Sequence, residues 1–161
     1  MEDGRQSRVT LRAAQTADEG LLRAVYASTR AEELAVTAWS EEQKSEFCRR
    51  QFGAQDAHYR KHYPTAQLSV IQQNGAPVGR LYVDRWEKEI RIMDIALLPE
   101  HRRRGIGTRL LRALQDEARA ASKVLSIHVE RFNPALRLYE RLGFKRTSVD
   151  GVYYLMKWVV E

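Results

Sequence analysis

The sequence predicts a mixed α/β domain, with a central and mostly antiparallel sheet of about seven strands and four flanking helices. Its segments alternate between the period of strands and that of helices, in the order strand, two helices, three strands, helix, strand, helix and a final hairpin. The strand, helix and strand of the second half imply a parallel pair joined by a right-handed crossover. A length of 161 residues suits one domain, expected over residues 1–161.

The first half begins with a short strand at Val9–Arg12. Thr16-Ala17-Asp18-Glu19 matches a capping box, which predicts that a helix starts there. A second box, Ser40-Glu41-Glu42-Gln43, predicts another helix that ends near His58 or Tyr59. We therefore expect two helices before the main part of the sheet.

Three antiparallel strands follow these helices. Gln67–Gln73 and Val78–Trp86 flank Asn74-Gly75, a dipeptide typical of a tight hairpin turn. The third strand, Ile90–Leu98, changes its apolar phase after Ile92. Burial on both faces would explain this change, and so would a β-bulge.

A helix after Gly105 and a strand at Val124–Val129 complete the predicted parallel unit. The helix has an apolar face opposite a polar face that we assign to Arg109, Arg112, Gln115 and Arg119.

Asn133 is placed as the cap of the last helix, with Pro134 in the first helical position and Gly143 as the terminator. Phe144–Val149 and Val152–Val159 then form a closing hairpin.

Composition limits the classes of function. Hydrophobic residues at 43% and charged residues at 30% are typical of a soluble globular protein. We find no apolar run of membrane-spanning length and no signal-peptide core, so a cytoplasmic location is expected. Cys48 is the only cysteine, which excludes an intrachain disulfide and a cysteine metal cluster, and we expect no metal.

The net charge of +6 raises nucleic acid as a partner. The basic residues are dispersed apart from Arg102–Arg104, and no motif for DNA or RNA binding is present. A small polyanion explains the one concentrated basic patch equally well. We therefore expect neither a nucleic-acid nor a membrane partner.

The turn between the third strand and the next helix has the features of an anion site. Gly105 and Gly107 leave the amides of the helix start accessible, and Arg102–Arg104 add forked cationic donors. A Walker loop is excluded because no Lys follows Gly107. A dinucleotide fingerprint is excluded because Leu110 stands where a third small residue is required. The expected ligand is a phosphate or pyrophosphate.

Two motifs carry a family resemblance. Arg102-x-x-Gly105-x-Gly107 resembles the acyl-CoA loop of the GNAT superfamily of N-acetyltransferases, and the segment from Asn133 to Phe144, NPALRLYERLGF, is similar to that family's second signature. The two occur in the family's order, and the predicted element order is similar to the GNAT fold over nearly the whole chain. The resemblance implies acetyl transfer from acetyl-CoA to a primary amine by direct attack.

The resemblance also implies where acetyl-CoA binds. The pantetheine arm would enter where two parallel strands splay apart, near Leu98 and Val129, and the pyrophosphate would lie on the turn before the helix. The residues that correspond to the family's cofactor contacts are Ile95, Ala96, Leu97, Arg102, Arg103, Arg104, Gly105, Ile106, Gly107, Thr108, Asn133 and Tyr139.

Tyr139 matches the family's general acid, which would protonate the departing thiolate, although its place on an apolar stripe also suits a core tyrosine. The Leu97 N–H would face the thioester oxygen. Asp94 is our candidate general base; His128 and Glu130 are alternatives.

The acceptor is left open by the sequence. The resemblance places the first two helices and the closing hairpin around the amine, so the candidate contacts are Glu32, Glu33, Trp39 and Tyr153. A small molecule is slightly favoured as the amine acceptor. A protein N-terminus or lysine, and a non-catalytic acyl-CoA-binding domain of the same fold, are the alternatives. A homodimer also remains open.

Overall fold

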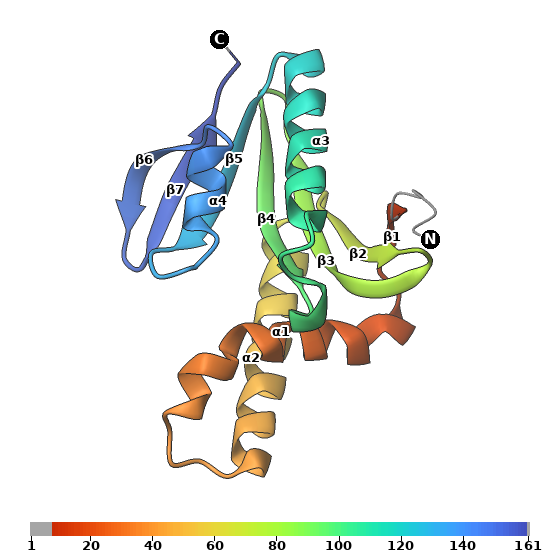
Figure 1. Ribbon diagram of the computed structural model, residues 1–161, viewed down its shortest axis with the longest axis vertical. Coiled ribbons are helices and arrows are strands. Elements are labelled where there is room, and N and C mark those ends of the chain that lie inside the picture. The colour runs from red at the N-terminus through yellow and green to blue at the C-terminus, as the bar shows by residue number, and fades with distance from the viewer. Residues whose placement is uncertain (1–7, 161) are drawn as a thin grey trace, which may run out of the picture. The chain divides into compact units, whose positions relative to one another are not determined.

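The computed structural model describes residues 8–160. Its strands form one hydrogen-bonded sheet in the order β1-β2-β3-β4-β5-β7-β6 (Figure 1). The strands are β1 Val9–Ala13, β2 Gln67–Gln73, β3 Ala76–Arg85, β4 Glu89–Leu97, β5 Val124–Glu130, β6 Lys145–Asp150 and β7 Tyr153–Trp158. The helices are α1 Glu19–Ala35, α2 Glu41–His62, α3 Ile106–Ala121 and α4 Leu136–Arg141, with short 3-10 turns η1 Thr16–Asp18 and η2 Pro99–His101. β4 and β5 are parallel, and the predicted fold class is confirmed.

Contacts within the chain divide these residues into two compact units. The first, here the N-terminal unit, contains residues 8–81 and 96–102. The second, the C-terminal unit, contains residues 82–95 and 103–160. β3 and β4 contribute residues to both units.

The N-terminal unit is built around an apolar cluster that joins α1 and α2 to β2. Tyr26 on α1 meets Phe52 on α2 edge-to-face, with ring centroids 6.3 Å apart. Cys48 is buried in the same cluster, and burial raises the pKa of its thiol. Cys48 is therefore a packing residue of this cluster. The buried members of the cluster are Leu22, Tyr26, Leu34, Cys48, Phe52 and Val70.

The start of α1 differs from the predicted capping box. Asp18, and not Glu19, accepts a backbone hydrogen bond, from the Gln15 N–H at 2.8 Å, and a 3-10 turn precedes the helix. Asp18 also accepts two 2.8 Å bonds from the Arg12 guanidinium, which lowers the pKa of its carboxyl group to about 2. The salt bridge from β1 therefore moves the box upstream by one residue.

The second capping box is confirmed. The Gln43 N–H donates to Ser40 Oγ at 3.1 Å, and the Ser40 N–H donates to Gln43 Oε1 at 2.8 Å. The hairpin turn is also confirmed, because Asn74 and Gly75 both have positive φ, at 52° and 84°.

β4 buries the consecutive residues Ile92 and Met93, at the point where the apolar phase of the sequence changes. Neighbouring side chains of a regular strand point to opposite faces. The change of phase also falls where the pairing of β4 with β5 ends, since Ile92 is the last β4 residue in register with β5.

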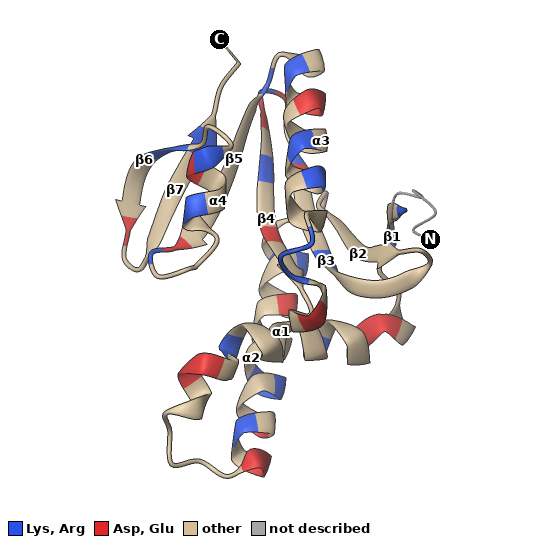
Figure 2. Ribbon diagram, in the orientation of Figure 1, with Lys and Arg blue, Asp and Glu red and all other residues tan. Residues whose placement is uncertain are grey.

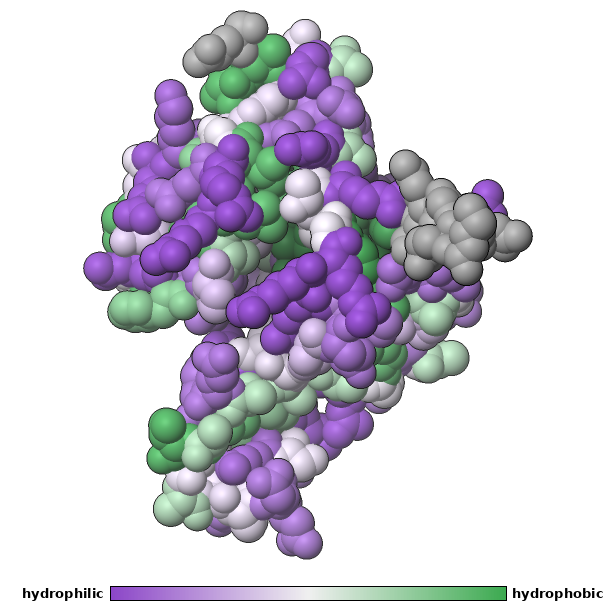
Figure 3. All heavy atoms as spheres, viewed as in Figure 1, coloured by the Kyte–Doolittle hydropathy of each residue, from purple (hydrophilic) through white to green (hydrophobic). Residues whose placement is uncertain are grey.

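α3 supplies the apolar layer of the C-terminal unit and contacts β5 (Figure 1). Gln115, predicted on its polar face, is instead 8% exposed, and its amide donates to the Leu142 carbonyl at 2.8 Å. This partner, which local periodicity does not reveal, explains the burial. The rest of the outer α3 surface is mostly hydrophilic (Figure 3). The buried residues of α3 are Ile106, Leu110, Leu111, Leu114, Gln115 and Ala118.

α4 starts two residues later than predicted. Asn133 Oδ1 accepts from the Ala135 N–H at 2.8 Å, and the Asn133 carbonyl accepts from the Leu136 N–H at 3.1 Å. Asn133 thus caps a tight turn that contains Pro134, and the α-helix begins only at Leu136. The N-cap of α4 is Ala135, so the prediction of Asn133 as the helix cap was wrong, and so was the placement of Pro134 in the helix.

No helix within residues 8–160 is both long and apolar enough to cross a lipid bilayer.

The same substitution at two neighbouring glycines should have opposite effects on stability. Gly105 has φ of 82°, so Gly105→Ala places a side chain in the left-handed region and should cost about 1–2 kcal/mol. Gly107 lies in the first turn of α3 with no atom within 4 Å of an added Cβ, so Gly107→Ala should stabilise by about 0.5–1 kcal/mol. Thermal unfolding should show Tm falling by about 2–6 °C for the first and rising by about 1–3 °C for the second. Equal shifts would contradict the assigned backbone conformations.

Candidate functional site

β4 and β5 are paired over only the first part of their length. The registered pairs end at Ile92 with Ile127, although both strands continue beyond these residues. Within the described C-terminal unit, Met93–Ile95 has no registered partner on β5. Peptide groups on this side of β4 are therefore open to a ligand, and the expected splayed parallel pair is confirmed.

The turn before α3 presents an array of backbone amides. Arg103 and Gly105 both have left-handed backbone, with φ of 61° and 82°. Alternation of left-handed and right-handed residues turns successive N–H groups inward, which is the geometry of an anion-binding nest. The first α3 bond runs from the Arg109 N–H to the Gly105 carbonyl at 3.0 Å, so the amides of residues 106–108 have no acceptor within the helix.

The turn itself contains the consecutive basic residues Arg102, Arg103 and Arg104, which colour it blue in Figure 2. Arg103 and Arg104 are exposed. Arg102 instead donates from Nε to the Leu97 carbonyl at 2.9 Å and from Nη2 to Ser28 Oγ at 3.0 Å. Arg102 thus fixes the end of β4 to α1 within the N-terminal unit.

Gly79 on β3 supports the backbone of the same strand end. A Cβ at Gly79 would lie 2.3 Å from the Ala96 carbonyl oxygen and 3.0 Å from the Leu97 Cα. The first of these distances is shorter than real Cβ contacts, so only glycine fits here. Leu98 also donates from its N–H to the Val78 carbonyl at 2.8 Å. Sequence reasoning missed Gly79, although an isolated glycine inside a strand pattern is a recognised signal of close backbone approach.

α4 ends in a Schellman motif that places Tyr139. The Phe144 N–H donates to the Tyr139 carbonyl and the Gly143 N–H to the Glu140 carbonyl, both at 3.0 Å, with Gly143 at φ of 98°. The rings of Tyr139 and Phe144 lie 6.1 Å apart, and both residues are buried. The final part of the second sequence motif is thus a helix terminator that fixes the ring of Tyr139.

The structure brings the two predicted catalytic residues together. Burial raises the pKa of the Tyr139 phenol, and the negative charge of Asp94 raises it further. Tyr139 therefore keeps its proton at neutral pH. Asp94 is half-buried on β4, immediately before Ile95 and in the part of the strand that is not paired with β5.

The other base candidates lie in different surroundings. His128 Nδ1 lies 3.5 Å from Arg91 Nη1, and burial together with the charge of Arg91 lowers the pKa of the imidazole. Arg91 also donates to Ser126 Oγ at 2.7 Å and to Glu89 Oε2 at 2.9 Å. Arg91 thus belongs to a network of an ion pair and hydrogen bonds with Glu89 and Ser126.

The residues proposed for acceptor binding fall into separate units. Glu33 on α1 pairs with Arg30 at 2.7 Å, and Trp39, 41% exposed, packs against Phe47 with ring centroids 5.2 Å apart. Glu32 is exposed on α1. Tyr153, which is 43% exposed, begins β7 in the C-terminal unit. Their roles stay predictions.

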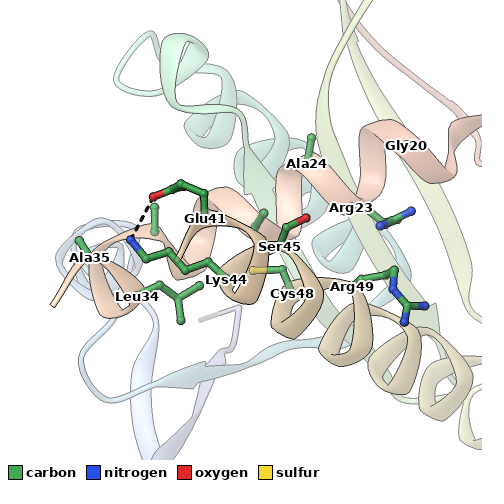
Figure 4. A pocket seen from close by; sticks show the side chains of 12 residues that line it. Gly20, Arg23, Ala24, Leu34, Ala35, Glu41, Lys44, Ser45, Cys48 and Arg49 are labelled. Carbon is green, nitrogen blue, oxygen red and sulfur yellow. Dashed lines mark hydrogen bonds and ion pairs between the residues drawn. The ribbon is translucent and has the colours of Figure 1, made fainter. Parts of the chain in front are cut away.

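A cavity of about 540 Å³ opens between α1 and α2 (Figure 4). Small residues of α1, among them Ala24, line one side, and Cys48 and Arg49 of α2 line the other. None of the predicted site residues lines it. We therefore place the candidate site at the splayed strands and the turn before α3, and not in this cavity. In the described residues, no three His, Cys, Asp or Glu side chains gather in a group able to hold a metal.

Comparison with known proteins gives relatives that match part of the chain. It is 39% identical over 67 residues to an N-alpha-acetyltransferase of Saccharolobus solfataricus, which covers 39% of this chain and 40% of the relative. It is 37% identical over 71 residues to a streptothricin acetyltransferase of Streptomyces lavendulae, covering 43% and 38%. A Mycobacterium tuberculosis N-alpha-acetyltransferase, RimI, is 38% identical over 66 residues, 41% of each chain. The chain thus spans about two-fifths of the length of these curated relatives.

Solved structures share the fold over nearly the whole chain. A PaiA N-acetyltransferase from Thermoplasma acidophilum, in complex with coenzyme A, has a TM-score of 0.71 at 17% identity, covering 95% of this chain and 99% of the other. YncA from Salmonella typhimurium, with its cofactor acetyl-CoA, has a TM-score of 0.58 at 24% identity, covering 96% and 95%. The sequence model of the Acetyltransferase (GNAT) family matches residues 23–144. The chain therefore belongs to the GNAT acetyltransferase family, whose acyl donor is acetyl-CoA.

Proposed function

We propose that the protein transfers the acetyl group of acetyl-CoA to a primary amine by direct attack. The observation that carries this proposal is the proximity of Asp94 and Tyr139 in the C-terminal unit, beside the part of β4 that leaves β5. A carboxylate and a phenol can serve as the proton acceptor and donor that acyl transfer to an amine requires. The backbone amides of the turn before α3 suit the pyrophosphate of the donor.

In the proposed reaction Asp94 accepts a proton from the ammonium, so that the neutral nitrogen attacks the acetyl carbonyl carbon. The Leu97 N–H donates to the carbonyl oxygen as it becomes negative. The new C–N bond forms, the C–S bond breaks, the attacking nitrogen releases its second proton to solvent, and the departing thiolate takes the phenolic proton of Tyr139. Solvent then returns a proton to Tyr139 and removes one from Asp94.

The donor would be held mainly by the backbone. The peptide groups of Ile95, Ala96 and Leu97 would bond the pantetheine arm, and those of residues 103–108 the pyrophosphate. Arg103 and Arg104 would add positive charge, since both are exposed. Arg102 would contribute chiefly by its hydrogen bond to the Leu97 carbonyl, which fixes the end of β4. Asn133 would contribute chiefly by accepting from the Ala135 N–H, which fixes the turn before α4.

We propose a small-molecule amine as the acceptor, with candidate contacts in each unit taken by itself: Glu32, Glu33 and Trp39 in the N-terminal unit and Tyr153 in the C-terminal unit. A carboxylate such as Glu32 would attract a cationic amine. A protein N-terminus is the second candidate, because three of the matched relatives are N-alpha-acetyltransferases. Another matched relative is instead a streptothricin acetyltransferase.

Donor binding and turnover can be tested separately. At a concentration of 100 times Kd, acetyl-CoA or CoA should stabilise the protein by about 2.7 kcal/mol and raise Tm by about 5–10 °C, whereas a DNA oligomer should not. With acetyl-CoA and a panel of small amines and peptides with free N-termini, the matching acceptor should cause release of CoA thiol. Binding without thiol release for any amine would favour a non-catalytic acyl-CoA-binding domain, and no Tm shift would contradict the donor assignment.

Tyr139→Phe should lower kcat by about 10²-fold and leave the KM for acetyl-CoA nearly unchanged. The substitution removes only the proton donor, while the ring stays against Phe144. Steady-state rates should be measured where chemistry limits turnover, with Tm as the check on folding. An unchanged kcat under these conditions would exclude Tyr139 as the acid.

Asp94→Asn should lower kcat and alter its pH profile, because the amide cannot accept the ammonium proton. It should also lower the pKa of Tyr139, since the charge that helps to raise this pKa is lost. His128→Gln is the matched comparison at the other candidate base. If His128→Gln altered the pH profile of kcat and Asp94→Asn did not, the general base would be His128 and not Asp94.

A further inference from the structure

Three contacts converge on the C-terminal end of α4, within the C-terminal unit. The Gln115 side-chain amide of α3 donates to the Leu142 carbonyl at 2.8 Å. Trp158 of β7 packs against Gly143, where an added Cβ would lie 3.2 Å from the indole ring. Phe144 packs against Tyr139. α3, β7 and the chain after α4 therefore hold the same helix end.

The Gln115 contact meets a specific need of the backbone. The last carbonyl groups of a helix have no N–H donor within the helix. The Schellman bonds use the carbonyls of Tyr139 and Glu140, and the Gln115 amide supplies a donor for that of Leu142. This bond is partly buried, so a carbonyl left without a donor there is costly, and removal of the amide favours a shift of the helix end.

Such a shift would reach Tyr139 directly. α4 has only 6 residues, and Tyr139 lies in its last turn. A helix this short receives little support from its own hydrogen bonds and depends on its contacts. Displacement of a catalytic group by about 1 Å can lower a rate by about 10²-fold.

We propose that Gln115 is a positioning residue for Tyr139, in that its amide fixes the end of α4 and so holds the phenol where it can donate its proton. Gln115 itself touches neither substrate. This inference rests on the proposed acid role of Tyr139. It adds to that role a residue on α3, which lies 24 positions earlier in the sequence.

The test is a double-substitution cycle in the full-length protein. Gln115→Met keeps the length of the side chain and removes the donor, and should lower kcat by about tenfold with the KM for acetyl-CoA changed by less than about twofold. In the Tyr139→Phe background the same substitution should lower kcat by less than about twofold, because the group that Gln115 positions is already absent. Arg112→Met is the matched control, since Arg112 is an exposed residue of the same helix.

Amide exchange gives a second readout. Gln115→Met should speed exchange at the Gly143 and Phe144 amides, and Arg112→Met should not. If Gln115→Met fails to fold, Gln115→Asn replaces it in the same double-substitution cycle. The amide of Asn is one methylene too short to reach the Leu142 carbonyl.

The cycle distinguishes a failure of the positioning role of Gln115 from a failure of the acid role of Tyr139. Equal losses from Gln115→Met in both backgrounds would overturn the positioning role and leave the acid role intact. A Tyr139→Phe variant with parental kcat would overturn the acid role, and the positioning inference with it.

Discussion

β4 and β5 run parallel, yet they are hydrogen-bonded only as far as Ile92 and Ile127. Parallel neighbours need a crossover, here α3, and the crossover must begin where the first strand ends. The amino end of α3 and the open backbone of β4 are thus joined by one short loop. Anion-binding amides and unpaired strand peptides follow from a single topological constraint, and the proposed donor site depends on both.

The second constraint is the exact end of α4. Gly143 adopts a φ that other residues avoid, and the bonds that this allows bring Phe144 back against Tyr139. Burial then keeps the phenol protonated, at the cost of making it a weaker acid. Because the reference pKa of a thiol, about 8.5, already lies below that of a phenol, about 10, burial and the charge of Asp94 both make proton transfer from Tyr139 to a thiolate less favourable.

The sequence was sufficient wherever local signals decide the structure. The period of strands, the Asn74-Gly75 turn and the Ser40 capping box all depend on neighbouring residues, and each was found as predicted. Prediction from the sequence failed where a residue distant in the chain determines the local structure. Asp18 replaced Glu19 in the first capping box because Arg12 reaches it from β1.

The site was predicted to an unequal degree. The arginine–glycine turn could be derived from residue chemistry, whereas the pairing of Asp94 with Tyr139 came only from family resemblance. Gln115 looked like a solvent-facing residue, since periodicity cannot reveal that the carbonyl of Leu142 lies opposite it. The proposed acceptor residues belong to two different units, and the local pattern of the sequence contains no signal that relates them.

The buried sulfur of Cys48 has a practical consequence for enzymology. It is the only thiol of the chain, it is 8% exposed, and burial raises its pKa, so little of the reactive thiolate forms at neutral pH. A disulfide dye added to the folded enzyme would therefore react slowly with the protein itself. Colour that develops quickly reports CoA, and slow colour at the end of a time course reports unfolding.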